Sequence, residues 1–102
     1  MKISYQRTGG FAGMVMSFDI VTETLSSEEA EEIRELVTSA DFFRLPAVIP
    51  SASPGADQFQ YKLTVETEEQ RHSVEVGDAD VPEKLWPLLN KLRILSRSAR
   101  SS

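Results

Sequence analysis

The sequence predicts an α+β fold in the order β-β-α-loop-β-β-α, with a four-stranded, mainly antiparallel sheet and two helices packed on it. Two observations predict this class. Four segments alternate apolar and polar residues with the period of half-buried strands, and two others repeat apolar residues at the three- and four-residue spacing of an amphipathic helix. A chain of 102 residues fits a single domain, residues 1–102, that buries roughly two-thirds of its unfolded surface.

The first two strands are predicted over residues 2–8 and 14–20, where one side of each alternation is apolar. The glycine-rich segment 9–13 between them predicts a hairpin loop. Phe11 is the only large apolar residue in that loop. Burial under the sheet is the commoner fate of a large aromatic side chain, and exposure as an anchor for a partner is the alternative.

The first helix is predicted to begin after Ser26, which is spaced from Glu29 as in a capping box, with Leu25 placed to contact Ala30. An apolar stripe continues to Ala40. The glutamates near the helix start resemble a cation site, but acidic residues at that position also complement the helix dipole and keep the outer face in water, which is the preferred interpretation.

The segment after this helix has two different parts. Phe42, Phe43 and Leu45 are expected to pack the helix end onto the sheet. Three prolines in the following residues 46–57 exclude a helix and disfavour a central strand. An irregular connection of that length is either functional or a tolerated surface loop. It ends in a Pro-Gly turn that presents Asp57 at the rim of the sheet.

The third and fourth strands are predicted over residues 58–66 and 71–76, as a hairpin with a four-residue connection. His72 is in phase with the apolar residues of its strand, which indicates a partly buried sheet residue rather than a general base. The last helix is predicted to start from a cap at Asp80, to bend near Trp86, and to run regularly from Pro87 to about Arg97, with a frayed tail over 97–102.

Composition excludes several classes of function. The chain has no cysteine, so disulfides, thiolate catalysis and cysteine-based zinc sites are excluded. Its net charge of −5 argues against nucleic acid as a partner. Neither a signal peptide nor a membrane span is visible, so a cytoplasmic protein is expected. No nucleophile with its base, carboxylate pair, cofactor loop or metal cluster is recognisable, which predicts a binding protein without cofactor rather than an enzyme.

The two irregular segments are the candidate binding surface. If the first and third strands are antiparallel neighbours, the glycine loop and the loop ending at Asp57 leave the sheet at the same edge. Together they are large enough for a protease–inhibitor interface of about 800 Å² per partner.

These same segments resemble the emfourin family, small bacterial proteins that inhibit protealysin-like metallopeptidases of the thermolysin type. The resemblance covers nearly the whole chain. It is clearest in residues 4–13 (SYQRTGGFAG), 40–46 (ADFFRLP) and 53–61 (SPGADQFQY), and it continues through the prolines and leucines of 82–92.

The resemblance implies an inhibitor that blocks the cleft of a zinc peptidase with its loops. Separately, the free chain is expected to be a monomer. A carboxylate can take the open coordination position of a catalytic zinc, and Asp57 is the candidate ligand; a turn acceptor within the Pro-Gly loop is its alternative role. Phe11 would fill a substrate pocket, with Val48 and Ile49 as secondary candidates. The rival carboxylates are Asp19, Asp41, Asp78 and Asp80. The predicted target-binding residues are Gly10, Phe11, Ala12, Val48, Ile49, Pro54, Gly55, Ala56 and Asp57.

A second interpretation is a regulatory module that binds another protein through the sheet edge or the acidic helix and inhibits nothing. A small enzyme dependent on His72 is the third and weakest interpretation.

Overall fold

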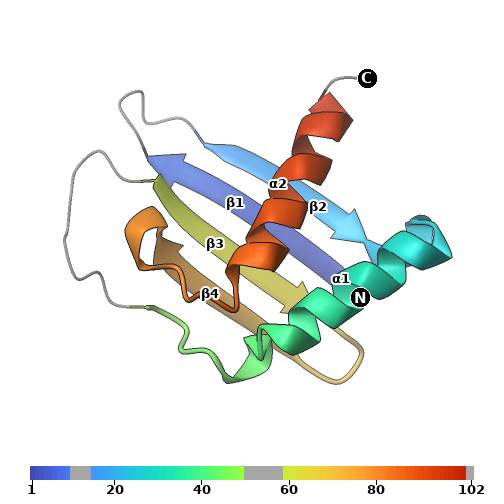
Figure 1. Cartoon of the computed structure of the whole chain (residues 1–102), viewed down its shortest axis with the longest axis horizontal. Helices are drawn as coiled ribbons and strands as arrows, with labels where there is room; N and C mark the ends of the chain where they lie inside the picture. The colour runs from blue at the N-terminus through green and yellow to red at the C-terminus, as the bar shows by residue number, and fades with distance from the viewer. Residues whose placement is uncertain (10–14, 50–58, 101–102) are drawn as a thin grey trace.

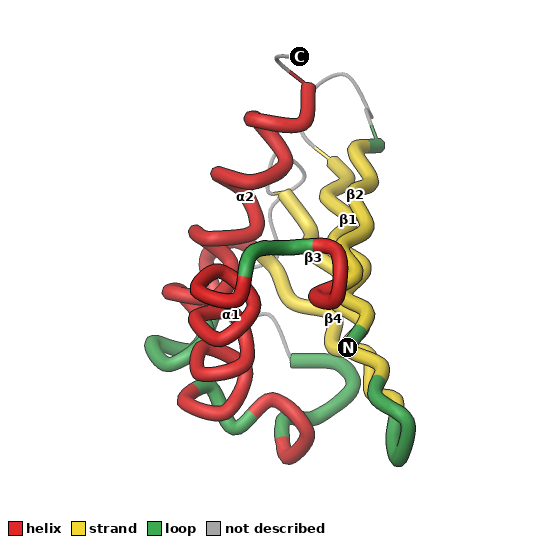
Figure 2. Tube along the Cα trace, turned by 90° about the vertical axis from the view of Figure 1, so that its right-hand side faces the viewer, coloured by secondary structure: helices red, strands yellow, loops and turns green. Residues whose placement is uncertain are grey.

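The protein is a two-layer α+β structure, with four strands in one layer and two helices in the other (Figures 1 and 2). The structure is a computed structural model that describes residues 1–9, 15–49 and 59–100. The predicted fold class and element order are confirmed. The strands are β1 (Lys2–Gly9), β2 (Met16–Val21), β3 (Phe59–Glu66) and β4 (Arg71–Gly77), and the helices are α1 (Ser27–Ser39) and α2 (Trp86–Arg100).

The sheet has the order β2-β1-β3-β4, and each pair of neighbouring strands is antiparallel. β1 and β3 are therefore the two central strands. Both helices cover the same face of the sheet, and no helix of the described residues lies against the opposite face (Figure 2). Within the described residues, no helix is long and apolar enough to cross a membrane.

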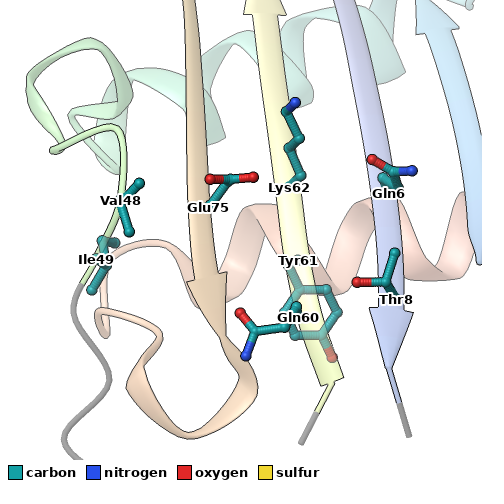
Figure 3. A pocket seen from close by; sticks show the side chains of 8 residues that line it. All are labelled: Gln6, Thr8, Val48, Ile49, Gln60, Tyr61, Lys62 and Glu75. Atoms are coloured by element: carbon teal, nitrogen blue, oxygen red, sulfur yellow. The ribbon is translucent and has the colours of Figure 1, made fainter. Parts of the chain in front are cut away.

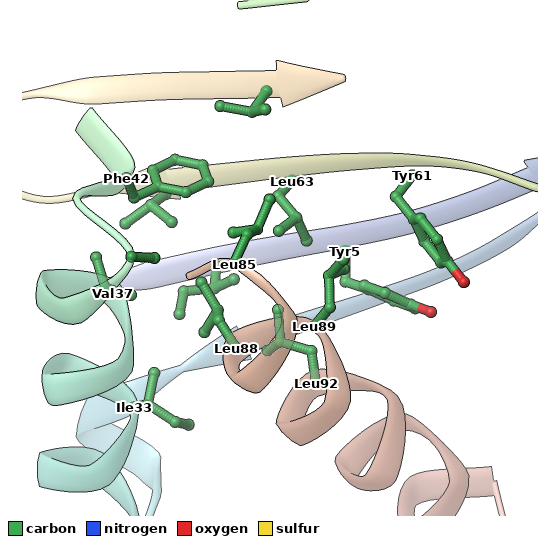
Figure 4. Close-up of a cluster of buried hydrophobic side chains, with 14 of the residues drawn as sticks. Tyr5, Ile33, Val37, Phe42, Tyr61, Leu63, Leu85, Leu88, Leu89 and Leu92 are labelled. Carbon is green, nitrogen blue, oxygen red and sulfur yellow. The ribbon is translucent and has the colours of Figure 1, made fainter. Parts of the chain in front are cut away.

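The hydrophobic core lies between the sheet and the two helices (Figure 4). The alternating residues of the strands supply one side of it, and the leucine stripe of α2 and the apolar stripe of α1 supply the other. Burial of these side chains is the main favourable term in folding. The largest fully buried side chains include Tyr5, Phe42, Ile3, Ile33, Leu63, Leu85, Leu88 and Leu92.

The start of α1 confirms the predicted cap. Ser26 has an extended backbone, and its Oγ accepts a hydrogen bond from the backbone N–H of Glu29 at 3.2 Å. Ala30, Ile33 and Val37 are buried on the inner face. This local signal needs no tertiary information, which is why the sequence locates the helix start correctly.

The end of α1 packs onto the sheet through a short 3₁₀ turn, Phe42–Arg44, as expected. Asp41 precedes the turn with φ 53°, in the left-handed region, and Phe42 is fully buried. His72 Nε2 lies 2.6 Å from the backbone oxygen of Leu45, and its ring centroid lies 5.7 Å from that of Phe42. His72 is thus a half-buried sheet residue, in agreement with its phase in the strand.

The start of the last helix agrees with the prediction in part, because the regular helix begins at Trp86, next to the predicted Pro87, after a short turn. The cap at Asp80 is wrong, because Asp78–Asp80 form a separate 3₁₀ turn and α2 begins only at Trp86. The backbone N–H of Leu85 donates to Pro82 O at 2.9 Å, which closes a turn before the helix. Pro87 lies in the first helical turn, where its missing N–H costs nothing. The helix also continues to Arg100, beyond the predicted limit near Arg97.

Candidate functional site

The register of the central strands brings the two candidate segments to one edge of the sheet. β1 and β3 pair continuously from Lys2 opposite Glu66 to Gly9 opposite Phe59. Residue 10 continues from Gly9 and residue 58 leads into Phe59, so both segments attach where β1 ends and β3 begins (Figure 1). The sequence argument required the first and third strands to be antiparallel neighbours, and β1 and β3 are. We call this end of the sheet the loop edge, defined by Gly9 and Phe59.

Two of the nine predicted site residues belong to the described part of the chain. Val48 and Ile49 lie within the described part of the chain. The others lie outside the described residues: Gly10, Phe11, Ala12, Pro54, Gly55, Ala56 and Asp57.

Val48 and Ile49 have different environments although they are neighbours in sequence. The backbone N–H of Glu75 donates to Ala47 O at 2.8 Å, and the N–H of Ile49 donates to Glu75 O at 2.9 Å. This parallel bridge fastens the segment along the outer edge of β4. Val48 is 60% exposed, whereas Ile49 packs against the core. Val48 is therefore available to a partner, and Ile49 mainly holds the segment in place.

Both residues line a hollow of about 390 Å³ on the helix-free face of the sheet (Figure 3). Its floor consists of outward-facing residues of the strands β1, β3 and β4. Thr8 and Gln60 form the cross-strand pair directly inside the loop edge, so the hollow begins one residue from it. The residues that line it are Gln6, Thr8, Val48, Ile49, Gln60, Tyr61, Lys62 and Glu75.

Exposed apolar side chains adjoin both candidate segments. Val15 directly follows residues 10–14, and Phe59 directly follows residues 50–58. Val15 is 60% exposed and Phe59 is 39% exposed. Each of them adds exposed apolar surface directly beside one candidate segment.

The sequence argument missed the exposure of Phe59, because it assigned this residue to the core side of its strand. The side chain does lie on that side, but near the end of the sheet, and the guanidinium carbon of Arg7 lies 4.8 Å from its ring centroid. A signal was present in the sequence. Arg7 is in phase with the core residues Ile3 and Tyr5, and a cation at a core-phase position indicates that the helix cover has ended.

Two buried tyrosines lie side by side behind the loop edge. Tyr5 and Tyr61 have ring centroids 6.1 Å apart, and their hydroxyl groups point the same way (Figure 4). The Tyr61 hydroxyl donates to Asp78 Oδ1 at 3.1 Å. Burial, together with the charge of Asp78, raises the pKa of Tyr61 to about 12. Burial also raises the pKa of Tyr5, although nearby arginines, Arg7 first, act in the opposite direction.

The rival carboxylates are distributed over the whole molecule. Asp78 and Asp80 follow β4 at the loop edge, and Asp78 is engaged by Tyr61. Asp19 is exposed on β2, and Asp41 lies at the end of α1, 3.8 Å from Arg44 Nε. In the described part of the chain, no group of three or more His, Asp or Glu side chains could hold a metal ion.

Comparison with known proteins supports one family. No curated protein and no solved structure matches the chain. The model of the Emfourin family matches residues 5–93, which extend from β1 into α2 and include both candidate segments. The match covers most of the chain, and the chain therefore belongs to the Emfourin family.

Proposed function

We propose that this chain is a proteinaceous inhibitor of a thermolysin-like zinc metallopeptidase and has no catalytic activity of its own. Membership of the Emfourin family supports the inhibitory role. The structural observation that supports the proposal is the pairing of Gly9 with Phe59. This pairing attaches two chemically distinctive segments to one edge of the sheet. The paired strands β1 and β3 fix the positions at which the two segments leave the sheet, and such a fixed scaffold favours binding to a cleft.

In this proposal a carboxylate of the inhibitor occupies the coordination position that the peptidase keeps open for water. Asp57 is the proposed ligand, at the usual zinc–oxygen distance of about 2.0–2.2 Å. Displacing the zinc-bound water removes the nucleophile for peptide hydrolysis. Phe11 is the proposed occupant of a substrate pocket beside the metal, and the exposed Val48 adds apolar contact at the side.

The experiment is a peptide-hydrolysis assay of a thermolysin-like peptidase titrated with the protein. Stoichiometric inhibition without cleavage of the inhibitor is expected. Asp57→Ala should abolish inhibition and leave the melting temperature unchanged if Asp57 binds zinc. Loss of both would instead assign Asp57 to the turn. Asp19→Ala, which removes an exposed carboxylate from β2, is the matched control and should inhibit like the wild-type protein.

The same assay separates inhibition from a purely regulatory role. A stable complex that survives Phe11→Ala and Asp57→Ala but is lost on changing Glu31 and Glu35, on the exposed face of α1, would contradict the proposal. Absence of inhibition at micromolar concentrations of the protein would contradict it as well.

A further inference from the structure

The helix-free face of the sheet has two halves that differ in how their polar side chains are partnered. In the half away from the loop edge, the side chains pair with one another across β3 and β4. Thr64 Oγ1 lies 2.8 Å from Ser73 Oγ, and Arg71 Nε lies 3.7 Å from Glu66 Oε2. On this half the polar side chains of β3 and β4 are partnered within the protein, whereas Lys2 and Ser4 on β1 have no hydrogen bond or ion pair among the described residues.

The half next to the loop edge lacks such contacts. Its polar side chains make no hydrogen bond and no ion pair with any part of the chain that the structure describes. Lys62 and Glu75 are direct cross-strand neighbours, yet they are not paired. This group consists of Gln6, Thr8, Gln60, Lys62 and Glu75, all of which line the hollow described above.

The chemistry of this half fits a polypeptide segment. Two carboxamides, a hydroxyl, an ammonium and a carboxylate together offer both donors and acceptors, as an extended backbone requires. Val48, on the β4 side, adds an apolar contact beside them (Figure 3). In the free protein these groups are hydrated, so they cost no stability, and in a complex they exchange water for the partner's groups.

The usual size of an inhibitor interface also favours a contact at the hollow. A standard interface uses about 20–30 residues on each side. The two segments at the loop edge, 10–14 and 50–58, contain five and nine residues. By residue count the two segments alone fall short of such an interface, contrary to the expectation from the sequence, and the residues of the hollow adjoin the loop edge directly through Thr8 and Gln60.

We propose that this hollow is a second contact surface for the peptidase, occupied by a polar, extended segment of the peptidase surface beside its cleft. The proposal rests on the inhibitory function proposed above and assigns the hollow to affinity and partner selection, while the loop edge blocks the reaction. The hydrogen bonds and the apolar contact of such a surface act mainly on the rate of dissociation, whereas its charges act mainly on the rate of association.

The test compares Val48→Asp with Val21→Asp. Both replace an exposed valine with the same charge, but Val21 lies at the other end of the sheet from the loop edge, opposite Lys2. Val48→Asp should raise the inhibition constant about tenfold, mainly through faster dissociation, and still give complete inhibition at saturation. Val21→Asp should stay within about twofold of the wild-type protein.

A second pair of variants guards against a local effect on folding. Gln6→Arg fills the hollow, whereas Ser4→Arg adds the same side chain on the same face of β1, opposite Thr64. Gln6→Arg should weaken binding like Val48→Asp, with melting temperatures unchanged. The proposal is overturned if Gln6→Arg and Val48→Asp inhibit and dissociate like the wild-type protein while Asp57→Ala does not inhibit. Failure of the wild-type protein to inhibit would instead overturn both proposals.

Discussion

The two buried tyrosines offer a matched test of how this fold treats polar groups. Tyr61→Phe removes a hydroxyl that donates to Asp78 at 3.1 Å. Tyr5→Phe removes a hydroxyl that is buried and has no hydrogen-bond partner among the described residues. The two side chains are 5% and 1% exposed, so the hydrophobic contribution of the rings is nearly the same in both substitutions. The difference between the variants therefore compares a buried hydroxyl that has a hydrogen-bond partner with one that has none.

A hydrogen bond to a charged group contributes about 1.5–3 kcal/mol. The bond to Asp78 is longer than is usual between two oxygens, so the lower end applies, and Tyr61→Phe should cost about 1.5 kcal/mol. Tyr5→Phe should be neutral or stabilise by up to about 1 kcal/mol, because it removes an unpaired polar group from the core. For a domain of this size, the melting temperature of Tyr61→Phe should fall by roughly 6 °C.

Urea unfolding followed by far-ultraviolet circular dichroism at neutral pH measures both free energies. Equal destabilisation by the two variants would refute the reasoning. It would mean that the hydroxyl bonded to Asp78 stabilises the fold no more than the hydroxyl without a partner.

The same tyrosine predicts a loss of stability in alkaline solution. Burial, aided by Asp78, raises the pKa of Tyr61 from its ordinary value of 10.0 to about 12. Between these two values the unfolded chain has released the proton and the folded chain still holds it, so stability falls as pH rises. The loss is at most about 3 kcal/mol and is complete above the folded pKa. Urea unfolding from pH 9 upward should show this component in the wild-type protein and not in Tyr61→Phe; identical pH profiles would contradict it.

Three further substitutions test the local structure by thermal or urea unfolding. Ser26→Ala should cost about 1 kcal/mol through loss of the helix cap, whereas Ser27→Ala, one residue into α1, should cost little; equal effects would argue against the cap. Asp41→Gly should stabilise by up to about 1 kcal/mol because the backbone there is left-handed, and Asp41→Ala should destabilise. Phe42→Ala should cost about 3–5 kcal/mol, clearly more than Phe43→Ala, whose side chain is only half-buried.

The parts of the fold that depend on local chemistry could be predicted from the sequence. The alternation in β3 and β4 places Leu63 and Val74 in the core, and the cap at Ser26 starts α1 where expected. Asp80 shows where a local signal fails. Asp80, Pro82 and Glu83 have the order of a helix cap. Asp80 nevertheless ends a 3₁₀ turn, because the chain still has to cross from the sheet edge to the helix layer before α2 begins at Trp86.

The candidate site depends on contacts between distant parts of the chain, so it was harder to predict from the sequence. The sequence argument could only assume that β1 and β3 are neighbours, because the order of strands in a sheet depends on tertiary contacts. Val48 and Ile49 appeared equivalent in the sequence. The bridge to Glu75 separates them into an exposed and a packed residue, and no local pattern encodes a parallel bridge between 48 and 75. Phe59 was misjudged because alternation reports the side of a strand, not the extent of the helices that cover it.

The position of β1 beside β3 also determines when the binding edge comes into existence during folding. Each hairpin joins strands that are close in sequence, and hairpins of this kind form in about 1–10 μs. Gly9 and Phe59, by contrast, are fifty positions apart, and closing that long loop carries the larger entropic cost. The edge that is proposed to enter the peptidase is therefore absent from a chain that has formed only its hairpins. A partner bound across this edge stabilises the contact that is entropically hardest to make, so binding and completion of the sheet reinforce each other.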